Sequence, residues 1–248
     1  MGDLGRRVYG LAAIVLGVVG LVFDDYAAVW QPVPKTWPAH DLLAYVSGAI
    51  LLVGGVASFV PKAARWGALI LAVFYGLWVL ALKLPGVIAH PTHLAPWQAM
   101  AEIVAITVGG VLAYVLSGGV TRGETPVKIA RCVFGACCII FGAAHFVFLK
   151  ETAAFVPARI PPSPTFWAYA TGVCQIAAGV AFITGLQARL AAVLLTVMYI
   201  GFGLFVHLPL IMKDVHDHFG WCANAINGAL IGAAWCMADS LRRDRAKA

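Results

Sequence analysis

The sequence predicts an all-α membrane protein in which eight transmembrane helices form two parallel four-helix repeats. Hydrophobic residues make up 62% of the 248 positions and charged residues only 11%, whereas a soluble globular domain carries about 25% charged residues. The segment ARWGALILAVFYGLWVLALKLP at Ala64 returns as ARLAAVLLTVMYIGFGLFVHLP at Ala188, 124 residues later. Repetition at a fixed spacing indicates a duplicated structural unit. We therefore expect a duplicated membrane bundle.

Apolar runs of the right length account for each span. A helix rises 1.5 Å per residue, so about 20 apolar residues cross a hydrocarbon layer roughly 30 Å thick. Helices satisfy their own backbone groups in a layer that holds no water. The runs lie near residues 8–23, 41–60, 65–86, 96–117, 129–149, 165–184, 188–210 and 220–238. Asp24 and Asp25 follow the first run in place of a small-residue cleavage site, so we expect a span and not a signal peptide.

The repeat predicts the domain organisation. Residues 1–118 form the first, more divergent repeat, residues 119–128 a cytoplasmic linker, and residues 129–248 the second repeat with a basic tail. Pairs at the 124-residue spacing include Tyr45/Tyr169, Gly48/Gly172, Arg65/Arg189, Tyr75/Tyr199, Pro85/Pro209 and Trp97/Trp221. Four spans return the chain to its starting side, so a pseudo-two-fold axis along the membrane normal should relate the repeats. Close helix contacts are expected at Gly17/Gly20, Gly54/Gly55 and Gly109/Gly110.

The basic residues predict the orientation in the membrane. Twelve of the 17 Lys and Arg residues fall on the side that carries both termini. The other side holds Lys35, Lys83, Lys150, Arg159 and Lys213. The positive-inside rule then places both termini in the cytoplasm, in a multi-pass protein of a bacterial-type inner membrane. Because this topology explains the net charge of +6, we expect the lipid bilayer as a partner and no nucleic acid.

A proline-rich segment follows the first span of each repeat on the outer side. The two segments are DDYAAVWQPVPKTWPAHD and KETAAFVPARIPPSPT. Proline lacks the N–H and restricts the preceding residue, so irregular structure is expected. The aromatic residues Trp30, Trp37 and Phe155 favour a position at the membrane interface. We expect flaps that cover the bundle, with simple exposed loops as the alternative.

Polar residues inside the predicted spans are the candidate ligand-binding residues. They are Lys83 and Glu102 in the first repeat and His145, His207, Asn224 and Asn227 in the second. Lys83 pairs with His207 at the 124-residue spacing. In a structural interpretation, Lys83 pairs with Glu102, while His207, Asn224 and Asn227 share neutral hydrogen bonds. In a functional interpretation, each repeat has an outer polar pocket for the head of an apolar ligand such as a quinone.

No motif identifies a cofactor or a catalytic group. The haem C-x-x-C-H motif, the Rossmann glycine pattern and the P-loop are absent. All seven histidines fall at outer loops or outer ends of spans, but HPTH at His90 and HDH at His216 supply only two imidazoles each, so no metal site is predicted. The six cysteines form no C-x-x-C pair and are interpreted as buried thiols. The cofactor is not identified, and a quinone is the candidate. Enzymatic activity is neither predicted nor excluded.

The second half resembles the DoxX family of membrane proteins. The resemblance rests on FGAAHF at Phe141, FVPARIPP at Phe155, WAYATG at Trp167, ITGLQARLAAVLL at Ile183 and HLP at His207, and the first half is similar to a divergent copy. Some members of the family are the membrane subunit of a thiosulfate:quinone oxidoreductase. The resemblance therefore implies a quinone-linked redox or stress-related complex, with a redox partner subunit and an oligomer both left open. The alternative is a non-enzymatic carrier of lipid or small molecules, or an assembly factor.

Overall fold

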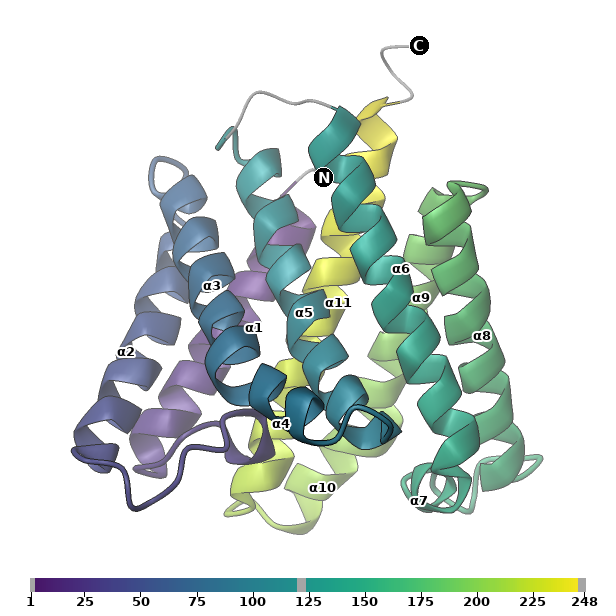
Figure 1. Ribbon diagram of the computed structural model, residues 1–248, viewed down its shortest axis with the longest axis horizontal. Coiled ribbons are helices and arrows are strands. Elements are labelled where there is room, and N and C mark those ends of the chain that lie inside the picture. The colour runs from purple at the N-terminus through teal and green to yellow at the C-terminus, as the bar shows by residue number, and fades with distance from the viewer. Residues whose placement is uncertain (1–2, 120–123, 245–248) are drawn as a thin grey trace.

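The structure is a computed structural model that describes residues 3–119 and 124–244. All regular elements in these residues are helical (Figure 1), so the all-α prediction is confirmed. The long helices of the first half are α1 (Leu4–Val22), α2 (His40–Ala57), α3 (Ala64–Trp78) and α5 (Leu94–Leu116). Those of the second half are α6 (Glu124–Val147), α8 (Pro164–Thr184), α9 (Ala188–Phe202) and α11 (His218–Asp244). The shorter elements are η1 (Ala28–Trp30), η2 (Val79–Lys83), α4 (Leu84–Ala89), α7 (Leu149–Ala154), η3 (Gly203–His207) and α10 (Leu208–Lys213).

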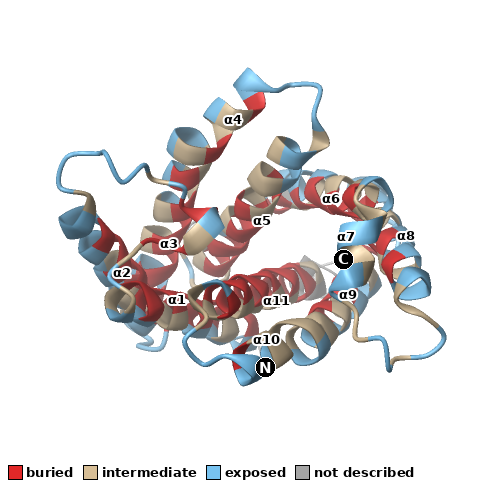
Figure 2. Cartoon of the chain, turned by 90° about the horizontal axis from the view of Figure 1, so that it is seen from below, coloured by how far each residue is buried: buried red, intermediate tan, exposed pale blue. Residues whose placement is uncertain are grey.

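Seven helical stretches in the described residues are long and apolar enough to cross a membrane, which makes this a multi-pass membrane protein. They are Leu4–Val22, His40–Ala57, Ala64–Ala89, Leu94–Leu116, Thr125–Val147, Pro164–Thr184 and Ala188–Lys213. The helix at the eighth predicted position, α11, is not among them because Asn224, Asn227 and Asp239 lower its apolarity. Residues 220–240 of α11 include no exposed residue, because α1, α5 and α9 surround it (Figure 2). A helix shielded from lipid in this way tolerates polar residues.

Helix packing follows the same pattern in both halves. In the first half α1 packs against α2, α2 against α3, and α3 against α5; in the second half α6 packs against α8, α8 against α9, and α9 against α11. The halves meet where α1 contacts α11, α6 contacts α5, and α5 contacts α11. Trp97 Nε1 donates to the carbonyl oxygen of Pro91 at 2.9 Å, and Trp221 Nε1 donates to that of Val215 at 3.0 Å. The loop before α5 and the loop before α11 therefore each contain the same type of hydrogen bond, at positions 124 residues apart.

The bundle has two distinct ends (Figure 1). The starts of α1, α3 and α9 and the ends of α2, α8 and α11 lie at one end, which we call the termini side. The opposite end carries residues 23–39 and 148–163, which we call the first flap and the second flap. Every histidine lies in an element or loop at the flap side. This end therefore holds the side chains that the sequence singles out.

Glycine allows close approach of the helices. A Cβ added at Gly17 would lie 2.6 Å from the carbonyl oxygen of Gly48, and one added at Gly142 would lie 2.6 Å from that of Gly172. Such distances are below any real contact, so the backbones themselves touch. The predicted contacts are confirmed at Gly17, Gly54, Gly55, Gly109 and Gly110. Gly20 differs, because the group nearest to it is the Asp25 carbonyl oxygen of the following loop, 3.2 Å away.

A proline explains the wide helical turn in each half. The π-helical segments η2 and η3 end directly before the Leu-Pro pairs that contain Pro85 and Pro209. Proline lacks an N–H, and its ring clashes with the carbonyl group four residues earlier in a regular helix. A π-helical turn moves that carbonyl aside, and such turns are frequent at functional sites. The turns place Lys83 and His207 at matching positions, each at the end of its π-helical segment.

Candidate functional site

The first flap folds into the flap side of the bundle. Its residues Tyr26, Ala27, Trp30 and Gln31 are buried. Trp30 Nε1 donates to Glu102 Oε2 at 2.7 Å, and its ring stacks on Phe219 at a centroid distance of 5.5 Å. The predicted flap is confirmed in this half, because its side chains pack between α5 and α11 instead of lying exposed.

Backbone and side-chain groups of this flap form hydrogen bonds with the polar residues of the first half. Lys83 is 7% exposed, and its Nζ donates to the carbonyl oxygen of Val29 at 2.9 Å. Gln31 Nε2 donates to Ser47 Oγ on α2 at 2.9 Å. Within the described residues no salt bridge joins Lys83 to Glu102, so the predicted Lys83–Glu102 ion pair is wrong. Lys83 bonds Val29 of the first flap instead, and Glu102 bonds Trp30 of the same flap.

Replacing Glu102 tests this arrangement. A Glu102→Gln variant keeps an oxygen that accepts from Trp30 Nε1, so its thermal midpoint should stay close to that of the native protein. A Glu102→Leu variant leaves the buried indole N–H without an acceptor and should lose about 1–3 kcal/mol of stability. Thermal unfolding in detergent compares the two. Equal midpoints for both variants would show that the Trp30 hydrogen bond is unimportant.

The second flap is arranged differently. None of residues 148–163 is buried, although Leu149–Ala154 form the short helix α7, which contacts α6 and α8. The expected cover is therefore wrong for this half, and the expected irregular structure is only partly found. The alternative, a segment exposed at the surface, describes the second flap.

His145 contacts in the second half the position that the first flap contacts in the first half. Its Nδ1 lies 3.1 Å from the carbonyl oxygen of Ala168 and 3.0 Å from Thr171 Oγ1 on α8. Thr171 follows Ser47 by 124 residues, and Ser47 binds Gln31 of the first flap. The His145 ring also stacks on Phe202, with centroids 6.4 Å apart. The Thr171 side chain therefore has its partner on α6, whereas the matching Ser47 side chain has its partner in the first flap.

The remaining polar groups of the second half are incompletely bonded. Asn227 is 4% exposed, and its Nδ2 donates to the carbonyl oxygen of Tyr199 at 2.9 Å, next to η3. Within the described residues, the buried Nδ1 of His207 and the Tyr199 hydroxyl have no hydrogen-bond partner. Half-buried Asn224 has none either, so the predicted hydrogen bonds among His207, Asn224 and Asn227 are not formed. A buried polar group without a partner costs about 1–3 kcal/mol, so it calls for an explanation.

Comparison with protein families identifies the second half. Residues 127–208 match the family model described as DoxX. The second half of this membrane protein is DoxX-like. The match runs from α6 through η3, so it includes His145, Thr171, Tyr199 and His207 and stops before α11. No curated protein and no solved structure matches the chain.

In this DoxX-like protein the structure adds residues that sequence reasoning missed. Tyr199 and its counterpart Tyr75 are both buried, and neither hydroxyl has a partner among residues 3–119 and 124–244. Their recurrence at the 124-residue spacing was the available signal. No sequence signal marks Gln31, because its partner Ser47 is set by the path of the flap. Since the tyrosines behave alike, the difference between the halves lies in the partners of Lys83 and His207.

The histidines of this DoxX-like protein are dispersed along the flap side. The rings of His90 and His93 face each other edge-on with centroids 5.7 Å apart, while His218 stacks on Phe23 at 4.8 Å. Within residues 3–119 and 124–244, no three His, Cys, Asp or Glu side chains come together as metal ligands. Cys174 is exposed and Cys132 half-buried, so the expectation of six buried thiols is wrong at these two positions.

Proposed function

We propose that the second half of this DoxX-like protein binds the head of a quinone, or of a similar lipophilic molecule, at the flap side. One observation carries the proposal: the buried Nδ1 of His207 has no partner in the part of the chain that the structure describes, whereas Lys83 at the matching position bonds the first flap. The second flap is exposed and does not supply this partner, so the proposed partner of His207 is a bound molecule. A polar residue that is buried in a membrane bundle and left unbonded is a binding-site candidate.

The chemistry of a quinone head fits these groups. A quinone carbonyl oxygen accepts a hydrogen bond, which the His207 imidazole and the Tyr199 hydroxyl are able to donate. The flat ring would find the aromatic faces of Phe202 and His145, which already stack on each other. Asn224 and Asn227 belong to the same proposed site, and electrons would come from a partner subunit in a redox or stress-related membrane complex.

We extend the proposal to the architecture around the site. The halves are parallel repeats about a pseudo-two-fold axis along the membrane normal, and α11 is the eighth span. The matched packing of α1–α2 with α6–α8 and of α3–α5 with α9–α11 supports this arrangement. The basic residues on the termini side support a cytoplasmic position for this side in an inner membrane. The proposed site then faces away from the cytoplasm.

Substitution of His207 tests the proposal. The full-length protein is purified in mild detergent, copurified quinone is quantified by mass spectrometry, and decylubiquinone is titrated by equilibrium binding. A His207→Leu variant should keep its thermal midpoint, because the imidazole Nδ1 makes no hydrogen bond that could be lost. Its affinity for decylubiquinone should fall about tenfold, the value of one lost hydrogen bond.

The control is His90→Leu, an exposed flap-side histidine at the end of α4. It should leave both the copurified quinone and the titration unchanged. Equal affinities for the native protein and the His207→Leu variant would refute the site. Recovery of bulk phospholipid alone would favour the carrier or assembly-factor alternative.

A further inference from the structure

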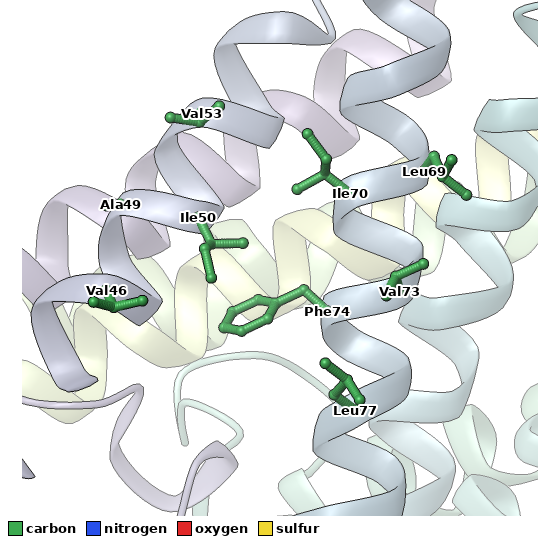
Figure 3. Close-up of a pocket in the computed structure, with 9 residues that line it drawn as sticks. All are labelled: Val46, Ala49, Ile50, Val53, Leu69, Ile70, Val73, Phe74 and Leu77. Carbon is green, nitrogen blue, oxygen red and sulfur yellow. The ribbon is translucent and has the colours of Figure 1, made fainter.

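The outer face of the first half carries an apolar groove between α2 and α3. Its volume is about 620 Å³, and apolar side chains of both helices line it. Figure 3 shows the ring of Phe74 reaching from α3 toward Ile50 of α2, with Val53 and Ile70 nearer the termini side. From Leu69 to Leu77 the groove follows α3 for about 12 Å, at 1.5 Å per residue. A single hydrocarbon chain fits a groove of this shape and composition.

One close helix contact and the divergence that follows it explain why the groove exists. Near the termini side, a Cβ at Gly67 would lie 2.6 Å from the carbonyl oxygen of Gly54, so α2 and α3 touch there. From this contact the helices diverge toward the flap side (Figure 1). The groove opens along the diverging part, on the face that meets lipid.

Positive charge stands at the end of the groove on the termini side. Lys62 and Arg65, on the loop between α2 and α3 and the first turn of α3, are both exposed. The Arg65 guanidinium lies over the Trp66 ring, 4.9 Å from its centroid. No Asp or Glu occurs between Asp41 and Glu102 in the sequence. Arg65 lies one helical turn, about 6 Å, before Leu69, where the lining begins.

We propose that this groove binds an anionic phospholipid, with one acyl chain along α2 and α3 and the phosphate at Lys62 and Arg65. The charge selects an anionic headgroup over a zwitterionic one, and Trp66 has the interfacial position typical of tryptophan. A quinone head has no charge for these cations to bind. This lipid site is separate from the proposed quinone site, which lies in the other half and at the other side of the bundle.

The second half supplies an internal comparison. At the 124-residue spacing, Leu186 replaces Lys62 and Gly201 replaces Leu77, while Arg189 corresponds to Arg65. The loop between α8 and α9 therefore offers fewer cations, and a residue without a side chain stands where Leu77 lines the groove. The proposal predicts a lipid site in the first half alone.

The experiment measures lipid retention and lipid binding in the full chain. The protein is purified in mild detergent, retained phospholipids are counted by native mass spectrometry, and dioleoyl phosphatidylglycerol and dioleoyl phosphatidylcholine are titrated against the thermal midpoint. The native protein should prefer phosphatidylglycerol. Each of Lys62→Gln and Arg65→Gln should weaken that binding about fivefold, because a cation near the membrane surface contributes about 1 kcal/mol. Arg189→Gln is the matched control and should change nothing.

A second variant separates the groove from its charges. Ala49 is exposed and lines the groove, so Ala49→Phe fills it without entering the core. It should lose the retained lipid, while Val173→Phe at the matching position on α8 should keep it. The proposal is overturned if Ala49→Phe retains the lipid, if both lipids bind equally, or if the molecule lost from Ala49→Phe is a quinone. Disulfide cross-linking of two Ala49→Cys chains in the membrane would also overturn it, because a second copy would then fill the groove.

Discussion

Replacing Gly232 with leucine should destabilise the bundle by more than about 3 kcal/mol, the upper part of the range for overpacking a core. A Cβ at this position would lie 2.5 Å from the backbone nitrogen of Tyr9, and no side-chain rotation relieves a clash with backbone. α11 would have to move away from α1, and the buried Tyr9 ring and its hydrogen bond to the carbonyl oxygen of Ile106 would be lost with it. The yield of monodisperse protein and its thermal midpoint measure the effect.

Gly201→Leu is the matched control, because an added Cβ at Gly201 of α9 meets nothing within 4 Å. Both changes replace helical glycine with a better helix former, so the gain in helix propensity is the same in each. A native thermal midpoint for Gly232→Leu would contradict the close packing of α1 and α11.

Replacing Trp30 with alanine should cost about 3 kcal/mol, the lower end for truncating a buried aromatic residue. The indole is 8% exposed, stacks on Phe219 and donates to Glu102. Its removal leaves a cavity between α5 and α11 and leaves the half-buried Glu102 side chain without its donor. Chemical or thermal unfolding in detergent measures the loss.

Two companion variants make this prediction specific. Trp37 belongs to the same flap but is 52% exposed, so Trp37→Ala should change stability by less than about 0.5 kcal/mol. Adding Glu102→Leu to Trp30→Ala should restore part of the loss, since no unbonded carboxylate remains. Equal effects of Trp30→Ala and Trp37→Ala would mean that the first flap is not inserted.

Much of the fold follows from apolar run length. The predicted span 41–60 corresponds to α2, and 188–210 corresponds to α9 with η3 and the first half of α10. Run length identifies these helices because a membrane imposes a fixed apolar thickness. It says less about α11, whose position inside the bundle removes the need for an apolar surface. The eight spans and the repeat symmetry remain predictions, with seven spans supported.

The partners of the polar residues were not predictable in the same way. Both flaps contain prolines and aromatic residues, yet only the first is inserted, because burial depends on what the neighbouring helices leave unfilled. The Lys83 ammonium bonds the carbonyl oxygen of Val29, a backbone group that every residue type carries. Sequence therefore indicated which residues are unusual, and only three-dimensional packing shows which of them, like His207, stay unbonded.

The contact between α1 and α11 also sets the order of assembly. Among the described helices, α1 emerges from the ribosome first and α11 last, and segments made in sequence tend to fold in that order. α1 is able to pack on α2 early, but the side where a Cβ at Gly5 would come within 2.7 Å of the Cys236 backbone nitrogen has no partner until α11 enters the membrane. Until then that small-residue side faces lipid or a membrane chaperone. The insertion of α11 thus completes the contacts of α1, α5 and α9, and a nascent chain arrested before α11 presents an unfilled core to quality control.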